Sequence, residues 1–197
     1  MLGTRVTFGA NTAVRLLKYN ANLSLAWTKE LSCQNLSPTT PDRSLTKGEA
    51  VINTPDGGFL VAGLYIADYD NTTGSLNDLI RINLARNKGW VAKLDGQGIV
   101  SWQKLLDNLP LTTDVNGPLP RSIGGMLTAT DVTLATDGNG YTLVGAGAEL
   151  LPHNFTAIST ALLELNADGS FKRAKSIGGL GTESFITPYV GSGGRKY

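Results

Sequence analysis

The chain has 197 residues, of which 41% are hydrophobic, and this is enough apolar material for a sizeable core. Its 17 basic and 16 acidic residues nearly cancel, and no stretch gathers lysine and arginine with aromatic residues, so the sequence predicts no nucleic-acid partner. No apolar run approaches the roughly 18 residues of a membrane-spanning helix, and the single cysteine, Cys33, excludes an internal disulfide.

The first predicted elements are two strands within residues 1–31. They flank the asparagine-rich turn of the run KYNANLSLAWTK at 18–29. A turn of this kind between two partly apolar runs is typical of a β-hairpin.

Residues 49–106 predict a unit of four antiparallel strands. Its tight turns, Asp56-Gly57-Gly58 and the Asp-Gly-Gln-Gly run at 95–98, are built from residues that tolerate positive φ. The stretch 76–86 fits either a strand or a short helix, and both interpretations stay open. The apolar runs of the unit lie at 51–52, 59–62, 90–94 and 99–106.

The same unit recurs in residues 130–177 and begins again in residues 183–197. The recurring unit departs from the preceding one at two tryptophan positions, because Ala161 stands in place of Trp90 and Arg173 in place of Trp102. Repeats of four short strands that cannot bury both faces alone predict an all-β chain of stacked sheets, the architecture of a β-propeller.

The motifs that repeat are DGGFLVAG at 56–63 and WVAKLDGQGIVSWQK at 90–104. They resemble a group of bacterial β-propeller repeats with the patterns D-G-G-[FY]-x-x-x-G and W-[LV]-x-K-L-D-x-x-G-x-x-x-W-x-K, which are quinoprotein-like in appearance. The resemblance implies propeller blades of four antiparallel strands and is nearly silent on activity, since propellers host many functions.

On this basis we expect a partial propeller of two whole blades and flanking half-blades. Two origins stay open: the chain is a segment of a longer protein, or several copies complete one another's blades. With either origin, the unpaired edge strands of an isolated chain would favour self-association. The expected parts are the last two strands of a blade in residues 1–31, whole blades in 49–106 and 130–177, and the start of a further blade in 183–197.

Repeat positions occupied by tryptophan and glycine are expected to be structural. Trp27 and Trp102 share one outer-strand position, from which a ring covers a sheet while its N–H reaches a carbonyl of the same or the adjacent blade. The glycines expected to be structural are Gly58, Gly63, Gly98 and Gly145.

The long connections all fall at one end of the predicted blades, opposite the tight turns. Variable loops on a rigid scaffold are where binding sites usually lie, so we expect the ligand or partner on this long-loop face. Aromatic rings beside carboxylates suit a sugar or a cation. The candidate ligand-binding residues are Tyr65, Asp68, Tyr69, Asp70, Asp78 and Trp90.

No catalytic residue, cofactor or metal site is predicted. His153 is the only histidine, and the run at 68–71 lacks the glycine and the terminal glutamate of an EF-hand. The expected function is a non-enzymatic binding or scaffolding propeller of a secreted or cell-surface bacterial protein, with a carbohydrate or protein ligand. The alternative is part of a propeller enzyme of hydrolase or quinoprotein type, in which Asn53, Asp131 and Thr133 would line the central axis.

Overall fold

The structure is a computed structural model, and it describes residues 2–5, 12–36, 44–67, 87–107, 109, 122–150 and 156–177. Within these ranges the chain forms eleven β-strands and one 3-10 turn, η1 (Gln34–Leu36), and the strands make three antiparallel sheets. The expectation of an all-β chain is therefore confirmed.

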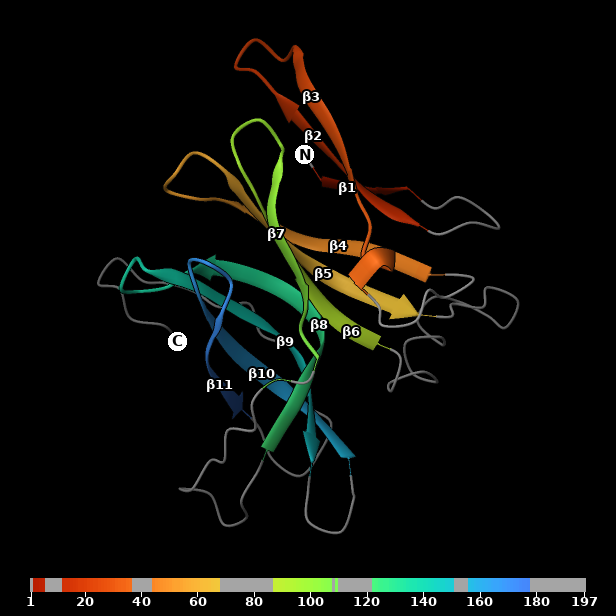
Figure 1. Cartoon of the computed structure of the whole chain (residues 1–197), viewed down its shortest axis with the longest axis vertical. Helices are drawn as coiled ribbons and strands as arrows, with labels where there is room; N and C mark the ends of the chain where they lie inside the picture. Colours follow the sequence, from red (N-terminus) through yellow and green to blue (C-terminus); the bar gives the residue numbers. More distant parts are fainter. Residues whose placement is uncertain are drawn as a thin grey trace.

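Each sheet is a simple meander in which consecutive strands pair. Figure 1 shows the three sheets following one another along the long axis of the molecule. The N-terminal sheet contains β1 (Leu2–Arg5), β2 (Ala13–Tyr19) and β3 (Leu25–Leu31). The central sheet contains β4 (Ser44–Asn53), β5 (Phe59–Ala67), β6 (Asn87–Leu94) and β7 (Val100–Leu105). The C-terminal sheet contains β8 (Ser122–Leu134), β9 (Gly140–Leu150), β10 (Thr156–Asn166) and β11 (Phe171–Ile177).

The N-terminal sheet has one strand more than the two expected from residues 1–31. In β1, Gly3 lies opposite Arg15 of β2, just as Gly63 lies opposite Trp90 in the central sheet. β1 has only four residues. A strand of this length is too short to show the alternation of apolar and polar residues by which a strand is recognised in a sequence.

The first strands of the other two sheets begin earlier than the boundaries at 49 and 130. β4 starts at Ser44 and β8 at Ser122. Register shifts interrupt both strands, one in β4 and three in β8. A bulge adds a residue to one strand and lets pairing continue where the sequence alternation breaks, so the pattern alone ends each strand too soon. The stretch at 76–86 and the unit at 183–197 lie outside the described residues.

The central sheet is buried on both faces. Residues 60–66 of β5 are all buried, and this explains why the sequence there is a continuous apolar run rather than an alternating one. One cluster joins it to the N-terminal sheet: Val14, Leu16, Leu31, Cys33, Val61, Tyr65, Trp90, Ala92 and Leu94. Another joins it to the C-terminal sheet: Leu60, Ala62, Val91, Leu106, Met126, Ala129, Val132, Tyr141, Leu143, Ala161, Leu163 and Leu165.

Candidate functional site

One contact between neighbouring sheets occurs twice in the same form, and we call it the sheet interlock. It joins the outer-strand tryptophan of one sheet to two residues of the next, a glycine in the outer turn and an aromatic residue at the start of the second strand. The first interlock comprises Trp27, Gly98 and Phe59, and the second comprises Trp102, Gly169 and Tyr141.

The two interlocks share their contacts but differ in ring orientation, with planes 82° apart in the first and 53° apart in the second. The ring centroids of Trp27 and Phe59 lie 5.6 Å apart, edge to face, and those of Trp102 and Tyr141 lie 6.3 Å apart. A Cβ atom added to the turn glycine would lie 3.2 Å from the tryptophan ring in the first interlock and 3.0 Å in the second. Each ring therefore rests directly on the turn of the following sheet.

Lysine side chains complete both interlocks. In the first, Trp27 Nε1 and Lys18 Nζ both donate to the carbonyl oxygen of Gly96, at 3.2 and 2.9 Å. In the second, Lys104 Nζ donates to the carbonyl oxygen of Gly169 at 2.9 Å and lies 5.8 Å from the centre of the Trp102 ring. The bonds from Trp27 and Lys104 tie the outer strand of one sheet to the outer turn of the next, and the bond from Lys18 ties β2 to the same turn as Trp27.

The C-terminal sheet carries a different pair at the same position. Lys18 faces Trp27 across the N-terminal sheet and Lys93 faces Trp102 across the central sheet, whereas in the C-terminal sheet Glu164 faces Arg173. Arg173 Nη2 and Glu164 Oε1 form an ion pair of 2.8 Å. The aromatic partner of the interlock is thus replaced by a charged one on this sheet.

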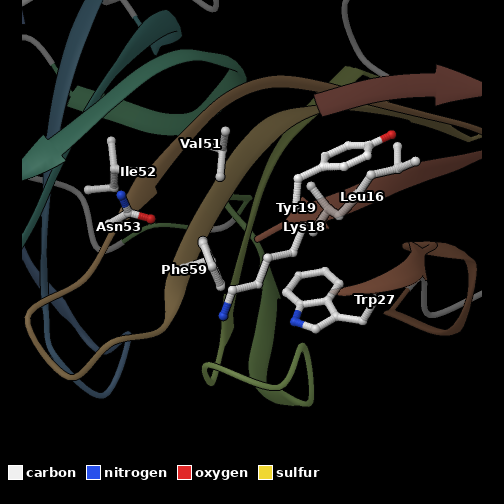
Figure 2. Close-up of a pocket in the computed structure, with 9 residues that line it drawn as sticks. Leu16, Lys18, Tyr19, Trp27, Val51, Ile52, Asn53 and Phe59 are labelled. Carbon is white, nitrogen blue, oxygen red and sulfur yellow. The ribbon is translucent and has the colours of Figure 1, made fainter. Parts of the chain in front are cut away.

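A hollow of about 410 Å³ lies between the N-terminal and central sheets, a volume in the range of small-molecule sites. Its walls come from the ends of β2 and β4, the start of β5 and Trp27 of β3, so it lies at the tight-turn end (Figure 2). The rings of Trp27 and Phe59 offer apolar faces, and the Asn53 amide offers hydrogen bonds. The lining residues are Leu16, Leu17, Lys18, Tyr19, Trp27, Val51, Ile52, Asn53 and Phe59.

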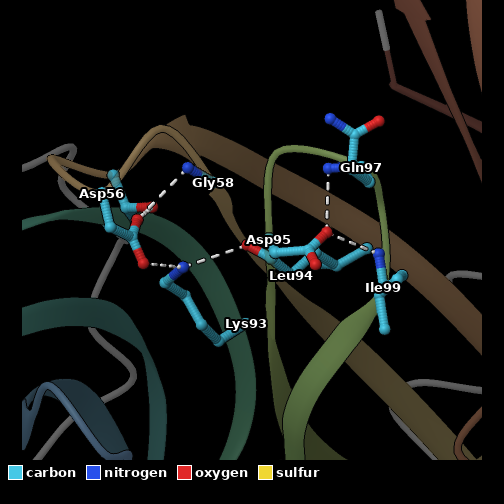
Figure 3. Close-up of polar contacts among 8 residues, drawn as sticks. Asp56, Gly58, Lys93, Leu94, Asp95, Gln97 and Ile99 are labelled. Atoms are coloured by element: carbon cyan, nitrogen blue, oxygen red, sulfur yellow. Dashed lines mark hydrogen bonds and ion pairs between the residues drawn. The ribbon is translucent and has the colours of Figure 1, made fainter.

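The turn that borders this hollow is fixed by an ion pair (Figure 3). The Lys93 side chain is only 6% exposed, and its Nζ donates to Asp56 Oδ2 at 2.7 Å and to the carbonyl oxygen of Leu94 at 3.0 Å. The hydrogen bond from Lys93, helped by one from Thr54, lowers the pKa of Asp56 to about 2. The Asp56 carboxylate therefore locks the first turn of the central sheet against β6.

The other turn carboxylates also bond to their own turns. Asp95 Oδ1 accepts the N–H groups of Gln97 and Ile99 at 2.8 and 2.9 Å. Asp137 accepts the N–H of Asn139 and pairs with Lys172, and Asp168 accepts the N–H of Ser170. These bonds lower the pKa of Asp137, chiefly through Lys172, and of Asp168, chiefly through Ser170. The acidic turns thus match turn chemistry, and the described ranges hold no cluster of three or more His, Cys, Asp or Glu placed to bind a metal.

Two of the expected ligand-binding residues lie in the core. Tyr65 and Trp90 are 0% exposed, and Trp90 Nε1 donates to the carbonyl oxygen of Lys47 at 3.0 Å. β5 and β6 stay paired beyond both positions, as far as Ile66 opposite Asn87. The sequence placed Tyr65 in the long loop and Trp90 at its mouth, but the longer pairing puts both rings inside the sheet, where they have no exposed surface. The other candidates, Asp68, Tyr69, Asp70 and Asp78, lie outside the described residues, as does His153.

The glycines and inner-strand residues named from the sequence are all described. A Cβ atom on Gly58, Gly63 or Gly145 would collide with a carbonyl oxygen of the adjacent strand, so these glycines permit close approach of two backbones. Of the residues assigned to the axis in the enzyme alternative, Asn53 is exposed and lines the hollow. Asp131 and Thr133 are partly buried in β8.

Sequence reasoning missed the hollow at the tight-turn end. Lys18, Tyr19 and Val51 line it, yet each reads as an ordinary strand residue. The available signal was the equivalence of Lys18 with Lys93, which marks both lysines as repeat positions near a turn.

No protein-family model matches the chain, and no curated protein matches it either. Among the described residues, no helix has the length and apolar character needed to cross a membrane. The functional interpretation therefore rests on the interlocked sheets, the hollow between two of them and the placement of the connections.

Proposed function

We propose that the protein is a non-enzymatic binding or scaffolding module whose three sheets are β-propeller blades, and that it belongs to a secreted or cell-surface bacterial protein. The sheet interlock is the observation that carries this proposal. Two copies of one contact hold three sheets in sequence, which is how stacked repeats form a common scaffold. A scaffold of this kind supports binding surfaces at its ends.

The two ends of the sheets differ in a way that favours one of them for binding. At the tight-turn end, carboxylates hydrogen-bond within the turns and Lys93 pairs with Asp56. At the opposite end, β5 ends at Ala67 and β6 begins only at Asn87. Long connections on a rigid scaffold are the usual place for recognition, so the proposed partner surface is the long-connection end, where Tyr69 and Asp70 fall in the sequence.

The hollow beside Trp27 and Phe59 is the second place where a ligand would bind. The apolar face of a sugar ring packs on aromatic side chains, and its hydroxyl groups match the donors and acceptors of the Asn53 amide. The same ligand class, a carbohydrate, is therefore compatible with either end, and the experiment has to separate the two.

Glycan-array screening followed by calorimetry tests the proposal with two matched double variants. One carries Tyr69→Ala and Asp70→Ala in the long connection, and the other carries Val51→Ala and Asn53→Ala in the hollow. We expect the first to weaken glycan binding by about tenfold or more and the second to leave it nearly unchanged.

The opposite result would move the binding site to the hollow. Absence of glycan binding by the unsubstituted chain would contradict a carbohydrate ligand. Release of a cleaved product from a bound glycan would contradict a non-enzymatic role.

A further inference from the structure

The outer turn of the N-terminal sheet departs from the other two sheets at one position. Leu23, Gly98 and Gly169 are equivalent, because each N–H donates to the carbonyl oxygen of the residue three positions earlier in the same type of turn. The glycines have φ of +79° and +77°, and Leu23 has φ of +63°. Leucine rarely adopts this left-handed conformation, so the turn is strained at Leu23. Leu23 is also 81% exposed, although it is apolar.

Two more exposed apolar residues flank the turn that carries Leu23, one at the end of β2 and one at the start of β3. One of them, Tyr19, also borders the hollow. Tyr19 and Leu25 face each other across β2 and β3 and are 44% and 53% exposed. The residues equivalent to Tyr19, which are Leu94 and Leu165, are buried. We call Tyr19, Leu23 and Leu25 the outer apolar patch.

The preceding sheet covers the equivalent positions elsewhere in the chain. Leu94 packs in the cluster that joins the central sheet to the N-terminal sheet, and Leu165 packs in the cluster that joins the C-terminal sheet to the central sheet. Trp27 and Trp102 lie over Gly98 and Gly169 in the same two interfaces. The fold itself therefore indicates what fits the outer apolar patch: the outer strand of another sheet of this repeat.

The C-terminal sheet departs from the repeat at the complementary position. It presents Arg173 where the other sheets present tryptophan, and this side chain is 70% exposed while paired with Glu164. A tryptophan ring leaves little room for a residue larger than glycine, since a Cβ atom would lie 3.0 to 3.2 Å from it. A slim arginine chain leaves room for the side chain of Leu23, and its methylene groups pack on apolar surface while the charged head stays in water.

We propose that the outer apolar patch binds the C-terminal sheet of a second copy of this chain, in the arrangement that the sheet interlock gives neighbouring sheets within one chain. Leu23 and Arg173 then meet across the two copies in place of the glycine and tryptophan of the internal interlocks. The contact is head to tail, and such contacts form rings when the rotation closes. The described residues of two chains bring six sheets, within the range of four to eight typical of closed propellers, so the expected assembly is a dimer.

A cycle of two substitutions tests this contact, with mass measured by light scattering and sedimentation over a range of concentrations. The unsubstituted chain should give a dimer. Leu23→Gly removes the apolar contact and should weaken dimerisation by about tenfold, while relieving the strained turn. Arg173→Trp alone should weaken it similarly, because the ring would collide with Leu23. The two substitutions together recreate the internal pair and should restore the affinity of the unsubstituted chain.

Ile99→Ser is the matched control, because Ile99 is an exposed apolar residue of the equivalent turn in the central sheet, where the other two sheets have serine. It should leave the mass unchanged. Thermal unfolding of every variant separates loss of association from loss of folding.

A chain that is monomeric at all concentrations overturns the proposal and assigns the outer apolar patch to a further sheet of a longer chain. A dimer in which the two substitutions act independently, with no restoration, also overturns it, because the two residues then do not meet.

Discussion

Four turn glycines, two beside a tryptophan ring and two without a near neighbour, allow the packing of the sheet interlock to be tested. Gly57, Gly98, Gly138 and Gly169 share nearly the same backbone conformation, with φ of 78°, 79°, 72° and 77°. A Cβ atom on Gly57 or Gly138 would meet nothing within 4 Å, whereas on Gly98 or Gly169 it would press on a tryptophan ring of the preceding sheet. Substitution by alanine therefore separates the cost of backbone strain from the cost of disturbing the interlock.

The two costs differ enough to be measured. Left-handed backbone costs an L-residue roughly 1–2 kcal/mol, and the stiffer unfolded chain of an alanine variant returns about 0.4–1 kcal/mol. Gly57→Ala and Gly138→Ala should therefore lower the free energy of unfolding by about 1 kcal/mol. At Gly98 and Gly169, overpacking adds roughly 1–3 kcal/mol, so we expect about 2–4 kcal/mol there. The Trp27 ring cannot retreat freely, because it also contacts Phe59 and donates to the carbonyl oxygen of Gly96.

Urea unfolding followed by tryptophan fluorescence measures these differences, and an unchanged m-value shows that the comparison concerns stability alone. Equal losses for Gly98→Ala and Gly57→Ala, within about 0.5 kcal/mol, would refute the reasoning that the tryptophan ring restricts this turn. In a Trp27→Leu background, the extra cost of Gly98→Ala should disappear, because the ring that creates it is gone.

Three further predictions concern the second interlock, the ion pair of Asp56 with Lys93, and the buried thiol of Cys33. Trp102→Ala should lower the free energy of unfolding by about 3–5 kcal/mol, because it leaves a cavity between two sheets. Arg173→Ala, at the equivalent exposed position, should lower it by less than about 1 kcal/mol. Similar losses for the two variants in urea unfolding would contradict the assignment of Trp102 to the interlock. Asp56→Asn should destabilise the chain by about 1 kcal/mol near neutral pH by removing the carboxylate partner of Lys93, since solvent screens a carboxylate that is 63% exposed. The pKa of Asp56 is lowered from 3.8 to about 2, so on acidification the unfolded chain takes up a proton before the folded chain does. The stabilisation by the Asp56 carboxylate is therefore complete above about pH 4 and is lost towards pH 2. The difference in free energy of unfolding between Asp56→Asn and the unsubstituted chain should close over that range. Burial raises the pKa of the Cys33 thiol to about 12, so a thiol reagent at pH 8 should modify Cys33 only at the rate of unfolding, and rapid modification of the folded chain would show that the thiol is accessible.

Local sequence was sufficient for the tight turns and for most strands, but not for β1, for the first residues of β4 and β8, or for which side chains are buried. The Asp-Gly motifs predicted the tight turns because their positive φ is a property of one or two residues, as at Gly57 and Gly98. Trp90 and Tyr65 were assigned to a binding surface because the sequence places them near a long connection, and only the pairing of β5 with β6 shows that they lie inside the sheet. The bulges that extend β4 and β8 likewise depend on register between strands.

The sheet interlock depends on residues that are distant in the sequence, such as Trp27 and Gly98. The repeat revealed that Trp27 and Trp102 are equivalent, yet it gave no distance between either ring and the turn of the following sheet. Those distances, 3.2 and 3.0 Å from a Cβ on the turn glycine, add a packing reason for glycine to the reason given by its positive φ. A repeated pattern thus identifies equivalent positions, and packing between repeats decides what each position does.

Tryptophan and glycine occur together in both internal interlocks. At the equivalent described positions on the two outer faces, Leu23 stands in place of the glycine and Arg173 in place of the tryptophan. A tryptophan against Leu23 would collide with its side chain, and Arg173 against Gly98 would leave the space of an indole ring unfilled. In the proposed dimer, each outer face would therefore pair with the other outer face more readily than with an internal sheet. Specificity of this kind comes as much from disfavoured pairs as from favoured ones. Two copies would then be directed to meet N-terminal sheet against C-terminal sheet, without competition from the interfaces that hold each chain together.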